Sequence, residues 1–352
     1  MQAIHHIEVI PESTNGGKFY VIADVHGEVE TLHSVLARLK PEDTLIIAGD
    51  LIDRGESDEN TPTSKEVLKL LMEYTQAPAG TKPKIHCIKG NHEIYFLNML
   101  KRLKPNLPIA DKKLLLKDLI TFVKNGGSWL FQRDPNNPDE INRYQWFRAH
   151  SCGLKTPECQ LEVARYLWKI INSPAPLAAI DPEVFTFQTY IEALPFVIKV
   201  EGEHPALIVH ADLPFSDEEI DERILHQTTF TDLEIQKLTD VRVANLATEG
   251  KRDHSSHLVI VGHNIIDEPG DTSIPHPALP VRPETNQINL DGGAYFTKGF
   301  LLFNLSDNTI EVIGNHISSE GQALLTYACD AIQTHLDDKA YEAAHSTKRR
   351  RI

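Results

Sequence analysis

The sequence lacks the features of a membrane protein and of a disulfide-rich secreted protein. It contains no run of about 18 apolar residues, the length that a membrane-spanning helix requires. Its first residues, MQAIHHIEVIPESTNGGK, show no basic patch followed by a long apolar core, so we expect no Sec-type signal peptide. The four cysteines are irregularly spaced and form neither a disulfide framework nor a paired zinc motif. These absences favour a cytoplasmic protein in a reducing compartment.

Positive charge is also scarce. The chain has 35 lysine and arginine residues against 50 aspartate and glutamate residues, a formal net charge of -15. No stripe of basic side chains runs through the bulk of the sequence, so binding to nucleic acid is not expected. Basic residues gather only in the last segment, STKRRRI, which we interpret as a solvated end; a nuclear or acidic-lipid address is the less favoured alternative.

The length and the composition are those of a globular protein with a substantial core. The chain has 352 residues, of which 41% are hydrophobic and 24% are charged. In its first third, short apolar strands alternate with amphipathic helices: KFYVIAD, DTLIIAGD and PKIHCIKGNHE read as strands, and residues 28–40 carry leucine and valine at helical spacing. Thr63 and Glu66 form a capping-box pattern before a second helix. This βαβαβ order predicts parallel strands with helices packed on the sheet.

Residues 107–193 read as a mostly helical insertion. KKLLLKDLITFVKNGG ends in a glycine suited to a helix C-cap, and PECQLEVARYLWKIIN begins with Pro157 at the first helical position. We expect the tryptophans at 129, 146 and 168 to form the core of this insertion. Strand patterns return at LPFVIKV, HPALIVHAD, HLVIVGHN, NQINLDGG, KGFLLFNL and TIEVIG, and a final amphipathic helix is predicted at about 319–337. The predicted class is α/β (α+β).

Polar residues of one chemical kind follow five of the predicted strands. A single such residue would be read as a turn residue or a helix N-cap. Five together, at the carboxyl ends where open α/β sheets place their ligand sites, predict a shell of nitrogen and oxygen ligands suited to Mn, Fe or Zn rather than to Ca or Mg. The residues are Asp24 and His26 in ADVHG, Asp50, Asp53 and Arg54 in GDLIDRG, Asn91, His92 and Glu93 in GNHE, His210 in VHAD, and His263 in VGHN.

Three of these motifs carry a family resemblance. DVHG, GDLIDRG and GNHE resemble the signatures of the calcineurin-like metallophosphoesterases, and the full GDLIDRG with GNHE resembles the phosphoprotein phosphatase branch. NGGSWLF, LPFVIKV, LIVHADLPF and QINLDGGAYF are similar to the bacteriophage lambda-type members. The resemblance covers roughly residues 18–305, with the insertion between its parts. It implies a four-layer α/β/β/α sandwich of two mixed sheets flanked by helices.

The resemblance also implies a domain order. We expect a catalytic domain over residues 1–315, with the insertion at about 107–193, followed by a C-terminal helix and basic tail over 316–352. The insertion is hypothesised to be a cap that selects a protein or peptide substrate. If so, deletion of 133–175 should alter the choice of protein substrate and leave hydrolysis of a small aryl phosphate intact.

The resemblance assigns a role to most of the strand-end residues. Two divalent metal ions, with Mn expected and Fe or Zn as alternatives, would hold a hydroxide for in-line attack on phosphorus. The implied ligands are Asp24 and His26 for the first metal, Asp50 as the bridge, and Asn91, His210 and His263 for the second.

The remaining site residues are expected to act on the phosphate and on the leaving group. Arg54 is suited to bind phosphate oxygens through its planar fork. Asp53 is expected to hydrogen-bond His92, which would act as the general acid. For Glu93, two roles are open: a side chain beside the site, or an acid at the helix start that only stabilises the helix dipole. Arg242 is the candidate for a second phosphate-binding arginine, with Arg223 and Arg252 as alternatives.

The function expected from the sequence is phosphomonoester hydrolysis on phosphoproteins or phosphopeptides, with Ser/Thr preferred over Tyr. A dinucleoside polyphosphate hydrolase on the same fold is the first alternative, because the fold alone does not exclude it. An inactive phosphatase-like binding module is the second. The resemblance indicates a bacterial or phage origin, with a translocated bacterial effector as a minority alternative to a cytoplasmic enzyme.

Overall fold

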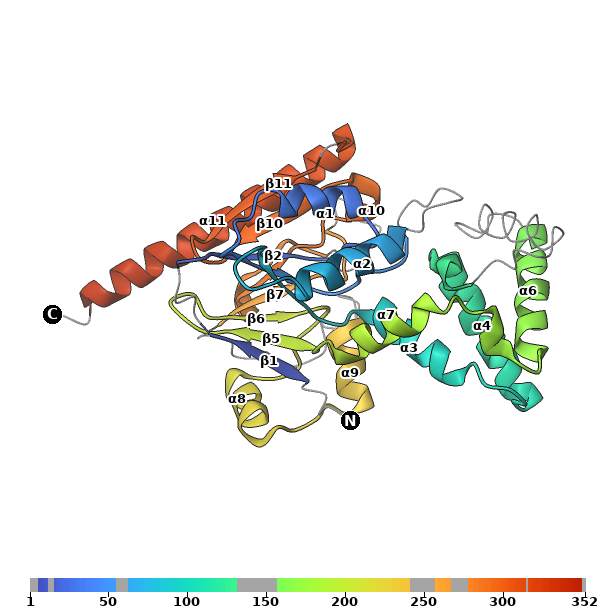
Figure 1. Cartoon of the computed structure of the whole chain (residues 1–352). Helices are drawn as coiled ribbons and strands as arrows, with labels where there is room; N and C mark the ends of the chain where they lie inside the picture. The colour runs from blue at the N-terminus through green and yellow to red at the C-terminus, as the bar shows by residue number, and fades with distance from the viewer. Residues whose placement is uncertain are drawn as a thin grey trace.

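Two stacked β-sheets run through the centre of the computed structural model (Figure 1), which describes residues 6–11, 16–54, 63–131, 157–240, 257–266, 278–314 and 316–349. The first sheet has five strands in the order β11-β10-β2-β3-β4. Their bounds are β2 Phe19–Ile22, β3 Thr44–Ile47, β4 Lys84–Cys87, β10 Phe300–Asn304 and β11 Thr309–Ile313.

The first sheet confirms the predicted parallel unit. β2, β3 and β4 pair in parallel, because each is joined to the next by a helix, whereas β10 and β11 pair antiparallel at the far side. The connecting helices are α1 Val29–Leu36 and α2 Thr63–Thr75, and their apolar faces pack on the outer face of this sheet. α1 is shorter than the predicted 28–40. A third helix, α3 Asn91–Arg102, follows β4.

The second sheet has six strands in the order β1-β5-β6-β7-β9-β8. β6, β7 and β9 are parallel, whereas β5 pairs antiparallel with β6, so this sheet is mixed as well. Two helices, α8 Asp217–His226 and α9 Asp232–Asp240, cover its outer face through Ile220 and Leu238. The strand bounds are β1 Ile7–Ile10, β5 Val197–Val200, β6 Ala206–Val209, β7 Leu258–Val261, β8 Val281–Arg282 and β9 Gln287–Asn289.

The two sheets share one apolar core. In β3, Leu45 and Ile47 face the helices and Ile46 faces the second sheet, where it packs with Ile208 and Ile260. Both faces of this strand are therefore buried, which explains why its sequence is an unbroken apolar run instead of an alternating one. The predicted four-layer α/β/β/α sandwich of two mixed sheets is confirmed.

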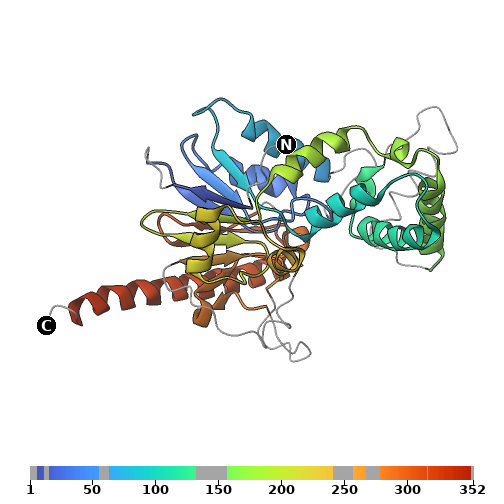
Figure 2. The same cartoon turned by 90° about the horizontal axis from the view of Figure 1, so that it is seen from below.

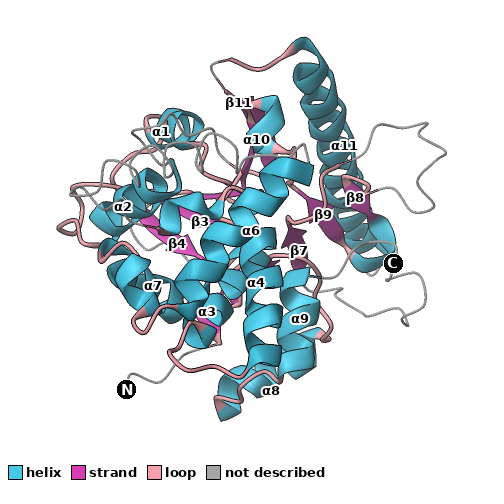
Figure 3. Ribbon diagram, turned by 90° about the vertical axis from the view of Figure 1, so that its right-hand side faces the viewer, coloured by secondary structure: helices cyan, strands magenta, loops and turns pink. Residues whose placement is uncertain are grey.

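The helices of residues 107–193, called here the insertion lobe, lie at one end of the sandwich (right in Figure 1, and again in Figure 2). α4 and α6 pack side by side (Figure 3), and α6 begins at Pro157 as predicted. α4 ends before Gly126, whose φ of +105° is the left-handed conformation expected of a helix-terminating glycine. The bounds are α4 Ile109–Lys124, the 3-10 helix η1 Gly127–Leu130, α6 Pro157–Asn172, η2 Pro176–Ala179 and α7 Glu183–Ala193.

The last helix is longer than predicted. α11 spans Ser319–Arg349, whereas the amphipathic pattern placed its end near 337. Leu325 and Ile332 are buried in the core between the sheets, and the far end of the helix extends beyond the sandwich (Figures 1 and 2). A short helix, α10 Ala294–Thr297, packs against it, and a 3-10 turn, η4 Pro283–Thr285, joins β8 to β9. None of the described helices is long and apolar enough to cross a bilayer.

Candidate metal centre

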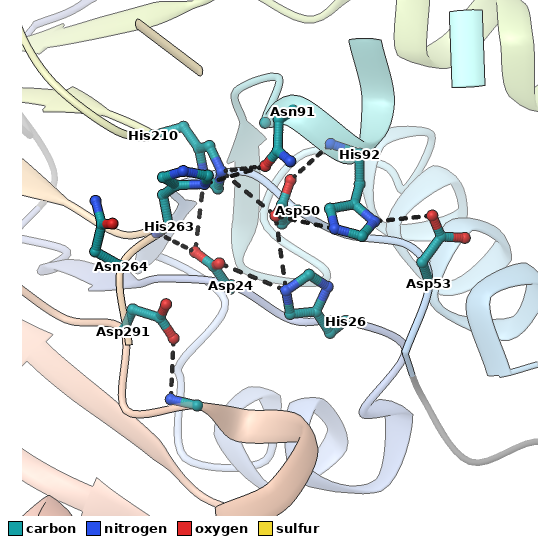
Figure 4. A network of polar contacts seen from close by, with 12 residues as sticks. Asp24, His26, Asp50, Asp53, Asn91, His92, His210, His263, Asn264 and Asp291 are labelled. Atoms are coloured by element: carbon teal, nitrogen blue, oxygen red, sulfur yellow. Dashed lines mark hydrogen bonds and ion pairs between the residues drawn. The ribbon is translucent and has the colours of Figure 1, made fainter. Parts of the chain in front are cut away.

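The polar residues that follow the strands meet at one place, the edge at which the carboxyl ends of both sheets lie together (Figure 4). They come from both sheets, and every one of them is buried, with 7% or less of its surface exposed. Their positions are Asp24 and His26 after β2, Asp50 after β3, Asn91 and His92 at the start of α3, His210 after β6, and His263 after β7.

Asp50 lies at the centre of this cluster. Its Oδ2 is 3.4 Å from His210 Nε2 and 3.6 Å from His26 Nε2. Two groups of possible metal-ligand atoms, each within 4.8 Å of one another, share this carboxylate: Asp50 with His26 and His92, and Asp50 with His210 and His263. A carboxylate common to two ligand groups has the position that a metal-bridging residue requires. His26 Nε2 is also 3.6 Å from Asp24 Oδ2.

The hydrogen bonds of two imidazoles fix which nitrogen faces the site. His210 Nδ1 lies 2.8 Å from the carbonyl oxygen of Ala48, and His26 Nδ1 lies 3.1 Å from that of Ile52. A carbonyl only accepts, so each Nδ1 carries the proton. Each Nε2 then points at Asp50 with its lone pair available when the ring is neutral, which is the usual arrangement behind a metal-ligating histidine.

The Asn91 amide fits a site built for cations. Its Oδ1 lies 3.1 Å from both His210 Nε2 and His263 Nδ1, which face the oxygen as acceptors when both rings are neutral. A divalent ion among these atoms would turn this unfavourable contact into a ligand set of nitrogen and oxygen. The amide turned by 180° would instead donate to Asp50, at 3.0 and 3.2 Å, and so satisfy the metal-free protein.

Asp291, which the sequence analysis did not single out, borders the same cluster. It is 2% exposed, and its Oδ1 accepts from the backbone N–H of Gly293 at 2.9 Å. Its Oδ2 has no hydrogen-bond partner among the described residues. Burial raises the pKa of Asp291 to about 6. A buried carboxylate oxygen without a donor is a further feature that a hydrated cation would satisfy.

The loops that carry these residues are conformationally strained. Ten non-glycine residues in the described part of the chain have a positive φ, and half of them belong to the site. Each such residue costs on the order of 1–3 kcal/mol and persists only where the surrounding structure enforces it. The five are His26, Asp50, Asp53, Arg54 and His263, with φ between 46° and 70°.

Two glycines make room for the carboxylates. A Cβ at Gly90 would lie 2.1 Å from Asp50 Oδ1, and one at Gly262 would lie 2.3 Å from Asp24 Oδ1. Both positions therefore exclude any side chain. The close approach of these loops to the two carboxylates thus requires glycine at both positions.

Glu93 ties two of the loops together. Its Oε1 accepts from the backbone N–H of Leu51 and its Oε2 from that of Gly90, both at 2.9 Å. The side chain is fully buried, and burial with the nearby Asp50 charge raises the pKa of Glu93 to about 7. Of the two roles left open by the sequence, Glu93 thus combines a helix cap with a place beside the site.

Without metal, the cluster holds an internal ion pair. Burial raises the pKa of Asp50, but the charges of His210 and His92 outweigh this effect and hold that pKa well below its usual value. Burial lowers the pKa of His210, yet Asp50 and Asp24 together raise it to about 10. Burial, with the repulsion of Asp291, raises the pKa of Asp24 well above its usual value. Metal binding must therefore displace protons.

His92 has the partner that the sequence predicted. Its Nδ1 lies 2.8 Å from Asp53 Oδ2, and its Nε2 lies 3.9 Å from Asp50 Oδ2, on the side of the possible metal ligands. Burial lowers the pKa of His92, but Asp50 and the hydrogen bond to Asp53 outweigh it, so the net shift is upward. Asp53 accepts a second hydrogen bond, from Trp129 Nε1 at 3.0 Å, which the sequence analysis missed.

The structure describes two of the four candidate arginines, Arg54 and Arg223. Arg54 follows Asp53 directly, and its positive charge opposes protonation of His26 and His92, although burial and Asp50 affect the pKa of both more strongly. Arg223 contacts Glu234 at 2.6 Å and stacks on Phe215, which occupies its guanidinium group. Arg242 and Arg252 lie outside the described residues.

Comparison with known families decides the assignment. A family model, calcineurin-like phosphoesterase, matches residues 17–263, which is most of the chain. The chain belongs to the calcineurin-like phosphoesterase family. The resemblance stated from DVHG, GDLIDRG and GNHE is thereby confirmed. No curated protein matches the sequence.

Solved structures similar to this calcineurin-like phosphoesterase include one described as a "putative diadenosine tetraphosphatase", with 14% identity and a TM-score of 0.46 over 89% of this chain and 99% of that one. Another is a metallophosphoesterase from Sphaerobacter thermophilus, with 15% identity and a TM-score of 0.33 over 92% and 99% of the two chains. The family consists of metal-dependent hydrolases, and the two ligand groups around Asp50 can hold divalent ions.

Proposed function

We propose that this chain is a metal-dependent protein phosphatase that hydrolyses phosphomonoesters, with Ser/Thr preferred over Tyr. One observation carries the proposal: Asp50 Oδ2 lies between His26 Nε2 at 3.6 Å and His210 Nε2 at 3.4 Å, and the His92–Asp53 pair lies beside it. This arrangement combines a place for two cations with a proton donor for the leaving group.

The residues that would hold the two ions are those assigned from the sequence. We propose that Asp24 and His26 hold the first ion and that Asp50 is shared with the second group. When bound, two divalent ions, with Mn proposed, would lower the pKa of a water and neutralise charge on the phosphoryl oxygens. The proposed second group is Asn91, His210 and His263.

The chain's own side chains then perform the remaining steps. Arg54 would bind the non-bridging phosphate oxygens through its guanidinium group. His92, held by the hydrogen bond to Asp53, which favours its protonated form, would donate its Nε2 proton to the leaving oxygen. The leaving group of a phosphoserine is a poorly stabilised alkoxide, so this proton is needed most for the substrate that we propose.

Two features favour a phosphoprotein over a dinucleotide. Arg54 in GDLIDRG and the lambda-type motifs belong to the phosphatase branch of the resemblance. The insertion lobe also borders the site, since the backbone oxygen of Asn125 accepts from the N–H of Arg54 at 2.7 Å. We therefore propose that the lobe shapes access for a protein or peptide segment in the cytosol.

A substrate comparison tests the proposal. The full chain, stripped with EDTA and reloaded with Mn, should release phosphate from phosphoserine and phosphothreonine peptides faster than from phosphotyrosine peptides. It should act poorly on diadenosine tetraphosphate. Faster turnover of the dinucleotide would instead support the alternative, a dinucleoside polyphosphate hydrolase. Equal rates with and without metal would contradict metal-dependent hydrolysis.

A further inference from the structure

Both oxygens of the Asp53 carboxylate have a partner. Oδ2 lies 2.8 Å from His92 Nδ1, and Oδ1 accepts from Trp129 Nε1 at 3.0 Å. An indole N–H only donates, so the direction of the second bond is unambiguous. The carboxylate is therefore held from two sides, and the three residues form a line from Trp129 through Asp53 to His92.

Trp129 itself cannot move easily. It is 2% exposed, and its ring lies 5.5 Å from that of Phe96, 6.2 Å from Phe122 and 6.4 Å from Phe187, measured between centroids. These rings belong to α3, α4 and α7, so three helices fix the indole. The prediction that Trp129 belongs to the core of the insertion is confirmed. Its indole N–H, however, points out of that core and donates to Asp53 at the site.

The same segment also holds the backbone beside Asp53. The N–H of Arg54 donates to the carbonyl oxygen of Asn125 at 2.7 Å. A Cβ at Gly126 would lie 2.6 Å from Arg54 N, so the two stretches of chain are in close contact. The backbone N–H of Asp53 donates to Ser64 Oγ at 2.9 Å. The insertion lobe, together with Ser64 of α2, thus fixes both the loop and the rotation of the carboxylate.

We propose that Trp129 is a positioning residue for leaving-group protonation, which makes the insertion lobe part of the reaction machinery. By holding Oδ1, the indole turns Oδ2 toward His92 Nδ1, and this keeps His92 Nε2 directed at the site. Without the indole N–H, Oδ1 is a buried acceptor with no donor, and the carboxylate gains freedom to rotate away from His92. The inference rests on the proposed function, because it assumes that His92 is the proton donor.

The test exploits the dependence of the reaction on its leaving group. Trp129→Phe keeps a ring in the aromatic cluster and removes only the donor. It should lower kcat on a phosphoserine peptide by about 10- to 100-fold, the usual effect of an outer hydrogen-bond partner. On p-nitrophenyl phosphate, whose leaving group needs little protonation, the loss should be several-fold smaller. In a His92→Asn background, Trp129→Phe should add no further loss, since the two residues act as a unit.

Trp168→Phe is the matched control, because Trp168 lies in α6 of the same lobe and is only half-buried. It should leave both rates and the metal content unchanged. Equal losses on the two substrates for Trp129→Phe, or a full additional loss in the His92→Asn background, would overturn the proposal.

A measurement that needs neither activity nor metal separates this inference from the proposed function. In ¹⁵N-labelled protein, Asp53→Asn should shift the indole N–H resonance of Trp129 and leave that of Trp168 in place. An unmoved Trp129 resonance would contradict the hydrogen bond. If Asp53→Asn shifts the Trp129 resonance but the wild-type chain shows no phosphatase activity, the hydrogen bond is retained and the proposed function is rejected instead.

Discussion

Asp50 and His210 lie 3.4 Å apart although they belong to different sheets, Asp50 after β3 of the first and His210 after β6 of the second. Their contact joins the two halves of the sandwich at the edge where the strands end. The pair is buried, and in the metal-free protein it carries opposite charges, because the pKa of His210 rises to about 10 beside Asp50. The candidate metal site therefore depends on the packing of both sheets.

Asp50→Asn is expected to remove metal and activity together. The amide keeps the size of the side chain but loses the charge that both ligand groups share. Metal analysis by mass spectrometry should show less than one ion per chain, with hydrolysis lost. Two ions still bound in the purified variant would contradict the bridging role.

Metal affinity is expected to rise with pH. In the metal-free protein, His210 is protonated below its pKa of about 10, and Asp24 has a pKa well above its usual value. Both must lose a proton to bind a cation, so affinity should increase about tenfold per pH unit for each proton released. Calorimetric titration with Mn in two buffers of different ionisation enthalpy counts these protons. Identical heats in the two buffers would contradict this prediction.

Metal removal is expected to lower thermal stability. An ion at 100 times its dissociation constant stabilises the folded chain by about 2.7 kcal/mol. For a chain of 352 residues that corresponds to a rise in Tm of roughly 4 °C. Differential scanning fluorimetry before and after EDTA treatment measures the change. Asp50→Asn is the control, and its Tm should respond little to added Mn.

His92→Asn is expected to slow turnover by about 10²- to 10⁴-fold with the metals retained, which is the usual contribution of a general acid. The loss should be greatest on substrates with poor leaving groups. Steady-state kinetics on phosphoserine peptides, with metal content measured on the same sample, checks both points. An unchanged rate on such a peptide would exclude His92 as the proton donor.

Gly90→Ala is expected to impair the site through crowding alone. The backbone of Gly90 is extended at φ −96°, which any residue adopts, but the new Cβ would lie 2.1 Å from Asp50 Oδ1. Displacement of Asp50 should weaken Mn binding by about 10-fold or more, and overpacking should cost about 1–3 kcal/mol of stability. Gly80→Ala meets nothing within 4 Å and tests backbone strain only, at φ +78°. Equal Mn affinity in both variants would contradict the steric argument.

Much of this site could be predicted because its residues can be recognised from their immediate neighbours in the sequence. Each polar residue stands directly after an apolar strand, and parallel strands bring their carboxyl ends together, so Asp24, Asp50 and His210 were expected to meet. The hydrogen bond between Asp53 and His92 was expected from the resemblance of GDLIDRG and GNHE to the family signatures.

Other features depend on contacts that leave no local pattern. Trp129 is 76 residues from Asp53, and its apolar neighbours marked it as a core residue, which it also is. β1 lies at the edge of its sheet and only its last residue is fully buried, so it lacks the continuous apolar run that marked the four-residue central strands. The extent of α11 was underestimated because its second half loses the apolar face on which the prediction relied.

The link from Trp129 to Asp53 bears on how this chain can be recombined with its relatives. A graft that exchanged residues 107–193 as a detachable recognition module would also exchange the indole that orients the proton donor. A chimera would keep its chemistry only if the donor segment brought an equivalent N–H to the same oxygen. Such a graft should therefore retain the segment up to Phe131 and also Phe187 of α7, whose ring packs on the indole.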